Sequence, residues 1–223
     1  MPAQQNSPVN VVRMICKHRV ARYGNSLFLF GGSINDPSSM FAEAGLMEPN
    51  MDMYEYNLLT NNWSKIVDYG HNSEHTALMD ASGGEVASSF AFFVRQVSED
   101  DEPSIILHGG VNSTTPIAGN AARSVFKFNL KKKEWKLLPN TSNIVPVATN
   151  SFAHTYRSFN DTLLIHGGMG GVLHESGGMM ISFSDEMWQY SFRDFAWSKI
   201  DWLQGEIAPL TRLGHSMCML NSH

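Results

Sequence analysis

Two histidines and a glutamate between positions 71 and 75 have a spacing that could support zinc chemistry. On a helix, His71 and His75 would lie one turn apart on the same face and could bind zinc, with Glu74 as a base. A glycine precedes this segment and a glycine pair follows it, which argues against a helix. We therefore predict neither a zinc peptidase nor a bound metal.

Other histidines recur at similar places along the chain. His18 and His154 each stand thirteen residues before the first glycine of a glycine pair, and His215 lies in a segment of the same kind. Residues that recur with a repeat usually stabilise turns by hydrogen bonds. His108 and His166 directly precede glycine pairs, where the first copy has phenylalanine, so we interpret them as packing residues.

Composition narrows the class of protein. The chain has 223 residues, 43% of them hydrophobic and 17% charged, which favours one domain of short strands and turns. Its net charge of −5 and scattered basic residues argue against nucleic acid as a partner. Two cysteines, Cys16 and Cys218, cannot form a disulfide framework, and the first twenty residues lack the apolar core of a signal peptide. We expect a cytoplasmic protein with no membrane partner.

A two-part pattern occurs three times. The runs SLFLFGG, SIILHGG and TLLIHGG end in the pairs Gly31 and Gly32, Gly109 and Gly110, and Gly167 and Gly168. Downstream, MYEYNLLTNNW, VFKFNLKKKEW and MWQYSFRDFAW each place an aromatic residue seven positions before a tryptophan: Tyr56 and Trp63, Phe128 and Trp135, and Tyr190 and Trp197. Such self-similarity predicts a repeat architecture.

Alternating aromatic residues within these units predict strands with one buried face. For the first unit we expect strands at residues 14–20, 26–31, 52–57 and 62–67, with tight hairpin turns before each tryptophan. The second unit departs from the pattern, because Gln96 stands where a histidine is expected and an acidic insert at residues 98–103 lengthens its first hairpin.

The strand ending in two glycines, the aromatic residue, the tryptophan and the upstream Arg-x-Gly-His-Ser resemble the Kelch repeat. This resemblance implies an all-β, Kelch-type β-propeller of four-stranded blades. After a polar segment at residues 1–11, the blades would cover about 12–67, 86–138 and 151–201, followed by a first strand at 211–220. Three blades would leave apolar faces in water. We therefore expect a fragment of a longer protein, or a protomer that self-associates to close the ring.

The resemblance implies a protein-interaction scaffold or adaptor rather than an enzyme, and no cofactor. Long connections between strands two and three, and between blades, would share one face of the propeller, where binding residues usually lie. The candidate partner-binding residues on these connections are Met40, Phe41, Leu46, Met47, His71, His75, His174, Met179 and Met180. The alternative is a propeller enzyme, galactose oxidase-like or isomerase- or lyase-like, with a site at the mouth of the central channel. A polar, convergent channel mouth would favour it.

Overall fold

The computed structural model describes residues 15–34, 48–67, 88–98, 101–111, 124–147, 150–173, 179–203 and 209–220. Within these ranges the regular structure is β-strand, apart from one turn of 3-10 helix, η3 (Ser158–Asn160). The predicted all-β class is confirmed.

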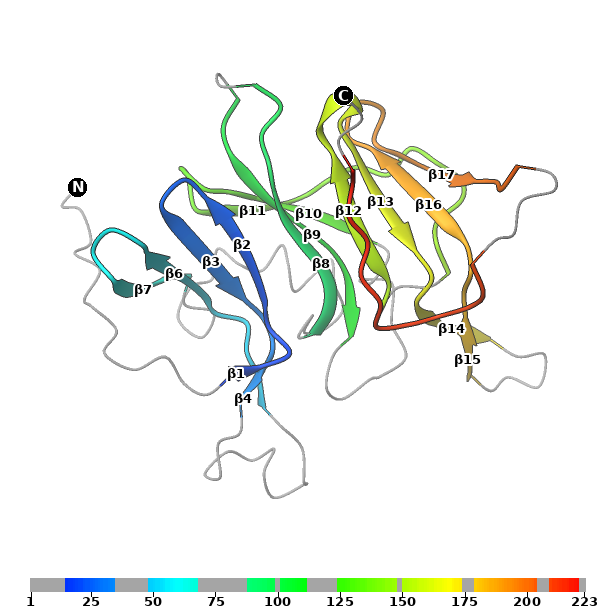
Figure 1. Ribbon diagram of the computed structural model, residues 1–223, viewed down its shortest axis with the longest axis horizontal. Coiled ribbons are helices and arrows are strands. Elements are labelled where there is room, and N and C mark those ends of the chain that lie inside the picture. Colours follow the sequence, from blue (N-terminus) through cyan, green and yellow to red (C-terminus); the bar gives the residue numbers. More distant parts are fainter. Residues whose placement is uncertain are drawn as a thin grey trace.

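Three four-stranded antiparallel sheets dominate the structure (Figure 1). Sheet I contains β2 (Arg19–Tyr23), β3 (Ser26–Phe30), β6 (Met53–Asn57) and β7 (Asn62–Val67). Sheet II contains β8 (Ser88–Arg95), β9 (Ser104–Val111), β10 (Val125–Asn129) and β11 (Glu134–Leu137). Sheet III contains β12 (Ala153–Arg157), β13 (Thr162–His166), β16 (Met187–Ser191) and β17 (Ala196–Ile200). In each sheet these strands pair in chain order.

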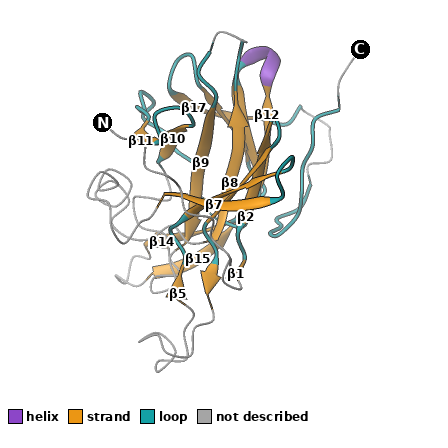
Figure 2. Cartoon of the chain, turned by 90° about the vertical axis from the view of Figure 1, so that its left-hand side faces the viewer, coloured by secondary structure: helices purple, strands orange, loops and turns teal. Residues whose placement is uncertain are grey.

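Two smaller sheets contain strands from the connections between the second and third strands, and one of them also includes a strand that precedes the first strand of sheet I. One joins β1 (Ile15–Cys16), β4 (Ser33–Ile34) and β5 (Glu48–Pro49), and the other pairs β14 (Met169–Leu173) with β15 (Met179–Phe183). Figure 2 shows β1, β5, β14 and β15 at the opposite end of the molecule from η3. The described parts of the long connections in sheets I and III therefore lie at one end of the molecule, the long-connection end, and the first hairpins lie at the other.

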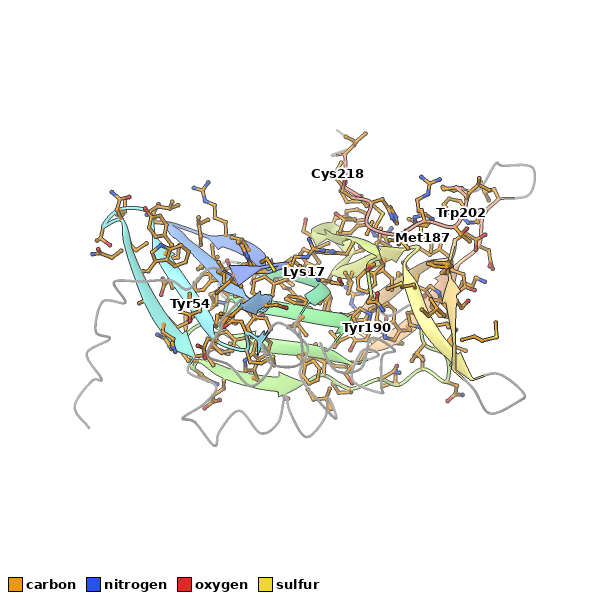
Figure 3. All side chains as sticks on the ribbon, turned by 90° about the horizontal axis from the view of Figure 1, so that it is seen from below. Lys17, Tyr54, Met187, Tyr190, Trp202 and Cys218 are labelled. Atoms are coloured by element: carbon orange, nitrogen blue, oxygen red, sulfur yellow. The ribbon has the colours of Figure 1, made fainter. Side chains whose placement is uncertain are left out.

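Sheet II lies between sheets I and III and is apolar on both faces. Phe90 and Phe92 of β8 point into a core shared with sheet I, whereas Ala91 between them packs toward sheet III. This alternation follows from the two-residue period of a strand. Figure 3 shows side chains filling the spaces between the sheets, among them Tyr190, which is fully buried between sheets II and III.

The repeated aromatic pairs occupy one register position in all three sheets. Trp135 faces Phe128 across β10 and β11, with ring centroids 5.1 Å apart, and both are buried against sheet I. Trp197 and Tyr190 pack in the same way against sheet II. The equivalent pair in sheet I, Tyr56 and Trp63, is in contact at 5.0 Å but remains half-buried.

The predicted tight turns between the third and fourth strands are also confirmed. In sheet I the side-chain oxygen of Asn57 accepts hydrogen bonds from the backbone N–H groups of Leu59 and Thr60. Asn129 does the same in sheet II for Lys131 and Lys132. These Asx turns explain why polar residues follow the paired aromatics.

The predicted first strand was misplaced. Residues 14–20 were expected to form it, but β2 covers Arg19–Tyr23, and the preceding β1 pairs with β4 instead. The first hairpins differ in length, with loops at residues 24–25, 96–103 and 158–161. Counting back from the glycine pairs therefore selects residues that are not equivalent. The histidine spacing is a coincidence in the third unit.

Backbone conformation identifies the equivalent positions. Lys17, Ser89 and Ser151 have positive φ angles of 60°, 63° and 55°, and each lies two residues before the first-strand residue that opposes Phe30, His108 or His166. Gly214, with φ of 67°, repeats this conformation. By this register His18 and His215 correspond to each other and to Phe152, while His154 lies two positions further along.

Residues 211–220, expected as the first strand of a further blade, are in the described part of the chain but form no strand. Figure 1 shows this segment, in red, running beside β12. The amide of Gly214 donates a 2.8 Å hydrogen bond to Ser151 O, as Ser151 N does to Ser89 O at 3.2 Å. The segment thus begins as the earlier first strands do, without a partner strand among the described residues.

In sheets I and III the paired glycines follow the second strands, and the second glycine of each pair lies very close to the backbone that leads into the first strand. Gly168 has φ of 91°, and a side chain there would place its Cβ 2.6 Å from Asn150 O. Gly32 has φ of 90° and is crowded in the same way by the carbonyl of Cys16. Glycine is required at both positions, because another residue would be strained by its conformation and by the clash.

Candidate functional site

The first strands of the three large sheets begin around a shared pocket at the long-connection end. β8 contacts both β2 and β12, which brings the starts of all three together. The pocket has a volume of about 540 Å³ and is lined by Arg19, Ser89, Ser151, Phe152, Gly214, His215 and Ser216. We call it the axial pocket. It is the closest counterpart in this structure to the channel mouth considered above.

Backbone hydrogen bonds between successive repeats build the rim of this pocket. The chain from Ser89 through Ser151 to Gly214 is linked by the two N–H to O bonds described above. The left-handed conformation at each position turns the chain into its first strand and presents these groups to the next repeat. Arg19 adds a hydrogen bond between sheets I and II, since its Nε donates to Phe90 O at 3.2 Å.

A histidine pair lies beside the axial pocket. Nδ1 of His166 and Nε2 of His215 are 3.0 Å apart, so one ring donates a hydrogen bond and the other accepts it. The His166 side chain is buried, and Trp202 contacts its ring edge-on. Burial, followed by the charges of His215 and Arg212, lowers the pKa of His166; burial and Arg212 lower that of His215. These shifts favour the neutral form of both rings.

The remaining histidines of the sequence pattern make contacts within the fold. His108 is buried between sheets II and III, its Nδ1 lies 3.0 Å from Ser124 O, and its ring contacts Trp197 at 4.7 Å. Burial lowers the pKa of His108 to about 4, and burial together with Arg19 does the same for His154. His18 Nδ1 lies 3.2 Å from Ile15 O, which agrees with the turn-stabilising role expected for it.

An apolar ribbon extends from sheet III at the same end of the molecule. It consists of β14 and β15, and on β15 the side chains of Met180, Ile181 and Phe183 are 54%, 55% and 53% exposed. Three large apolar side chains on one exposed strand are unusual for a surface that binds nothing. Met180 was predicted as a partner-binding residue, and Ile181 and Phe183 were not.

Two of the predicted binding residues, Met179 and Met180, lie in the described part of the chain, and their role in binding stays a prediction. Met40, Phe41, Leu46, Met47, His71, His75 and His174 lie outside the described residues. Met179 is the first residue of β15, and Met180 follows it. The zinc-like spacing at residues 71–75 lies outside the described residues as well.

Sequence reasoning missed the axial pocket altogether. Ser89 and Ser151 stand at equivalent positions and Arg19 lies two residues beyond the equivalent position of the first unit, but the unequal hairpins hide this in the sequence. Counting forward from the preceding unit would not have helped, because the connections between units also vary. Only strand register brings these residues together.

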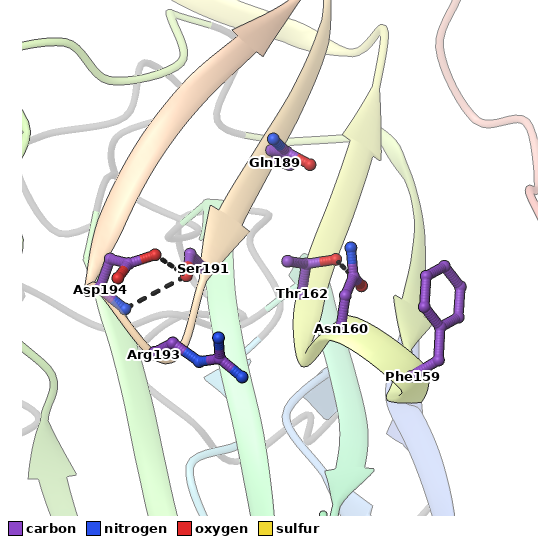
Figure 4. A pocket seen from close by; sticks show the side chains of 7 residues that line it. All are labelled: Phe159, Asn160, Thr162, Gln189, Ser191, Arg193 and Asp194. Carbon is purple, nitrogen blue, oxygen red and sulfur yellow. Dashed lines mark hydrogen bonds between the residues drawn. The ribbon is translucent and has the colours of Figure 1, made fainter.

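A second hollow lies at the hairpin end of sheet III (Figure 4). It has a volume of about 440 Å³ and is lined by Phe159, Asn160, Thr162, Gln189, Ser191, Arg193 and Asp194. Its polar groups largely satisfy one another: Ser191 Oγ donates to Asp194 Oδ2 at 2.7 Å, and Thr162 Oγ1 donates to Asn160 Oδ1 at 2.8 Å. The hollow therefore offers a ligand few free groups.

Two further observations come from the part of the chain that the structure describes. No group of three or more histidine, cysteine, aspartate or glutamate side chains is arranged there to hold a metal ion. No described helix is long and apolar enough to cross a membrane.

No protein family model matches the chain, and none of the curated proteins does.

Proposed function

We propose that this chain forms blades of a Kelch-type β-propeller and acts as a protein-interaction scaffold. Three four-stranded antiparallel sheets, stacked face to face with their first strands together, support the blade interpretation. The left-handed residue at Gly214 and its hydrogen bond to Ser151 support a further blade beginning there. The glycine pairs and aromatic pairs recur at equivalent register positions, as a blade repeat requires.

The binding surface in this proposal is the long-connection end, and the exposed apolar ribbon is the observation that carries it. Methionine, isoleucine and phenylalanine on an exposed strand suit a protein partner. Burying these side chains releases water and leaves no side-chain polar group without a hydrogen bond. Met180 adds adaptability through its flexible side chain. The rigid sheets hold the ribbon in place, as propeller scaffolds hold their loops.

Site-specific photo-crosslinking tests this assignment. With p-benzoylphenylalanine at position 183, the full chain should crosslink in cells to a defined partner protein. At position 159 it should not, although Phe159 is even more exposed at 78%, because that residue lies at the hairpin end. The matched pair differs in location rather than in side-chain chemistry.

The crosslinked partner must also depend on the ribbon. Ile181→Ser in the same chain should weaken crosslinking from position 183 by at least about tenfold if the residue lies in the centre of the contact. Equal crosslinking from positions 159 and 183, or no loss in the Ile181→Ser variant, would remove the ribbon as the binding surface.

The blade interpretation makes a separate prediction about association. Tyr56 and Trp63 are half-buried, whereas the equivalent pairs in sheets II and III are buried under a neighbouring sheet. We expect the 223-residue chain to self-associate through such faces, so multi-angle light scattering should give a mass well above 24.8 kDa. A cooperatively unfolding monomer that binds no hydrophobic dye would contradict this expectation.

A further inference from the structure

We propose that the axial pocket is a binding site for an oxyanion, the carboxylate or phosphate group of a small ligand or side chain. Arg19 would pair with the anion, and the hydroxyl groups of Ser89 and Ser151 would complete its hydrogen bonding. The site does not depend on the apolar ribbon, so it stands or falls independently of the proposed scaffold function.

One nitrogen of the Arg19 side chain is hydrogen-bonded within the fold, and its other two nitrogens are available to a ligand. Its Nε donates to Phe90 O, which fixes the side chain across the start of β8. Its two Nη groups have no partner among the described residues, and the side chain is exposed to the pocket. A guanidinium group with both outer nitrogens available can bind a carboxylate or phosphate through two parallel hydrogen bonds.

The serines supply hydroxyl donors that the fold itself does not use. Their backbone groups link successive repeats, but the hydroxyls of Ser89 and Ser151 form no hydrogen bond within the described part of the chain. Both residues hold positive φ angles, where glycine would be less strained, as it is at Gly214. Serine is therefore not what the backbone alone would favour at these positions.

Charge around the pocket also favours an anion. The protein carries a net charge of −5, yet none of the described residues that line the axial pocket carries a carboxylate. Near the histidine pair the charges of Arg212 and Asp185 act on His166 in opposite directions. The positive charge that lines the pocket itself is that of Arg19, and an anion would gain from it.

The size of the pocket indicates more than an inorganic ion. A volume of about 540 Å³ lies within the range of small-molecule sites and exceeds what one phosphate group fills. Phe152 contributes an apolar wall on which the rest of an organic anion could pack. The oxyanion is then the recognised group of a larger ligand.

Calorimetric titration of the full chain tests the site with defined probes. These are inorganic phosphate, N-acetyl-phosphoserine amide and N-acetyl-glutamate amide, with uncharged N-acetyl-glutamine amide as the control ligand. We expect the anions to bind and the neutral amide not to. The stronger of the two amino-acid probes identifies phosphate or carboxylate as the preferred group, and binding of both supports their shared chemistry.

Variants then locate the binding. Arg19→Gln should weaken anion binding by about tenfold or more, as expected for the loss of a charged hydrogen-bond donor. Ser151→Gly removes a hydroxyl without straining the backbone and should weaken binding several-fold. Arg22→Gln is the matched control, because Arg22 also lies on β2 but its Nε donates to Gly24 O at the hairpin end. That variant should bind normally.

Thermal unfolding of each variant shows whether it is folded before it is titrated. If Arg19→Gln does not fold, Ser151→Gly tests the location of the site instead. Absence of binding of all three anions at millimolar concentration would overturn the proposal. Equal weakening by Arg22→Gln and Arg19→Gln would also overturn it, since binding would then reflect general charge rather than this pocket.

Discussion

Replacing Trp135 by alanine should lower the free energy of unfolding by about 3–5 kcal/mol. The indole is 7% exposed in the core between sheets I and II, and its ring contacts Phe30 at 5.5 Å and Phe128 at 5.1 Å. Truncation removes this apolar area and leaves a cavity that two packed sheets cannot easily close. Urea unfolding followed by circular dichroism measures the loss.

Two controls separate packing from a general effect of mutation. Lys132→Ala lies in an exposed turn of the same sheet and should change the free energy of unfolding by no more than about 0.5 kcal/mol. Trp63→Ala changes the equivalent residue of sheet I, which is half-buried, and should fall between the two. If Trp135→Ala and Lys132→Ala cost the same, Trp135 is not part of a buried interface between sheets.

Replacing Asp161 by asparagine should destabilise the contact between sheets II and III. Asp161 accepts hydrogen bonds from Arg95 Nε at 2.7 Å and Nη2 at 2.5 Å, and from the hydroxyl of Tyr156 at 2.8 Å. Breaking a buried ion pair costs more than the pair contributes, because one charge is left unpaired. Since both side chains are slightly exposed, we expect a loss of about 2–3 kcal/mol rather than the full buried value.

The asparagine variant isolates charge from conformation. Asp161 has φ of 53°, which asparagine tolerates well, so the backbone should not be strained. The double variant Arg95→Met with Asp161→Asn should recover part of the loss, because no unpaired charge remains. The introduced methionine side chain can also pack on the ring of Phe192, which the guanidinium of Arg95 now covers at 4.9 Å.

The control variant is Glu102→Gln, which changes an exposed ion pair with Lys132 and should leave the free energy of unfolding unchanged. If the double variant is as unstable as the single one, the loss does not come from an unpaired charge.

The pKa values of this cluster agree with a tight pair. Burial alone would lower the pKa of Arg95, but the hydrogen bond and charge of Asp161 outweigh it and raise the pKa. Burial and the neighbouring Asp161 also raise the pKa of Tyr156. Arg95 therefore stays charged and Tyr156 stays protonated, as their three hydrogen bonds to the carboxylate require.

Most strands of the large sheets could be predicted from the sequence. The runs that end in paired glycines became β3, β9 and β13, and the alternating aromatics became β6, β10 and β16. These signals are local: a strand with a buried face alternates with period two, and a crowded backbone with positive φ requires glycine. Such signals can be recognised in the sequence without knowing which elements pack against each other.

The first strands and the axial pocket could not be predicted in this way. Their register depends on hairpins of different lengths, so a constant spacing from His18 to Gly31 and from His154 to Gly167 joined positions that are not equivalent. The structure instead aligns His18 with Phe152, which shares its place before the strand and directly follows a residue of the same left-handed conformation.

The amino-acid sequence is enough to predict the all-β class, the three repeated units of the described region and the residues that fill the spaces between sheets. The folded structure is needed to see which first-strand residues meet, and therefore that Arg19, Ser89 and Ser151 line one pocket. A strand is encoded within a few residues, whereas the convergence of three strands depends on pairing register across connections of unequal length.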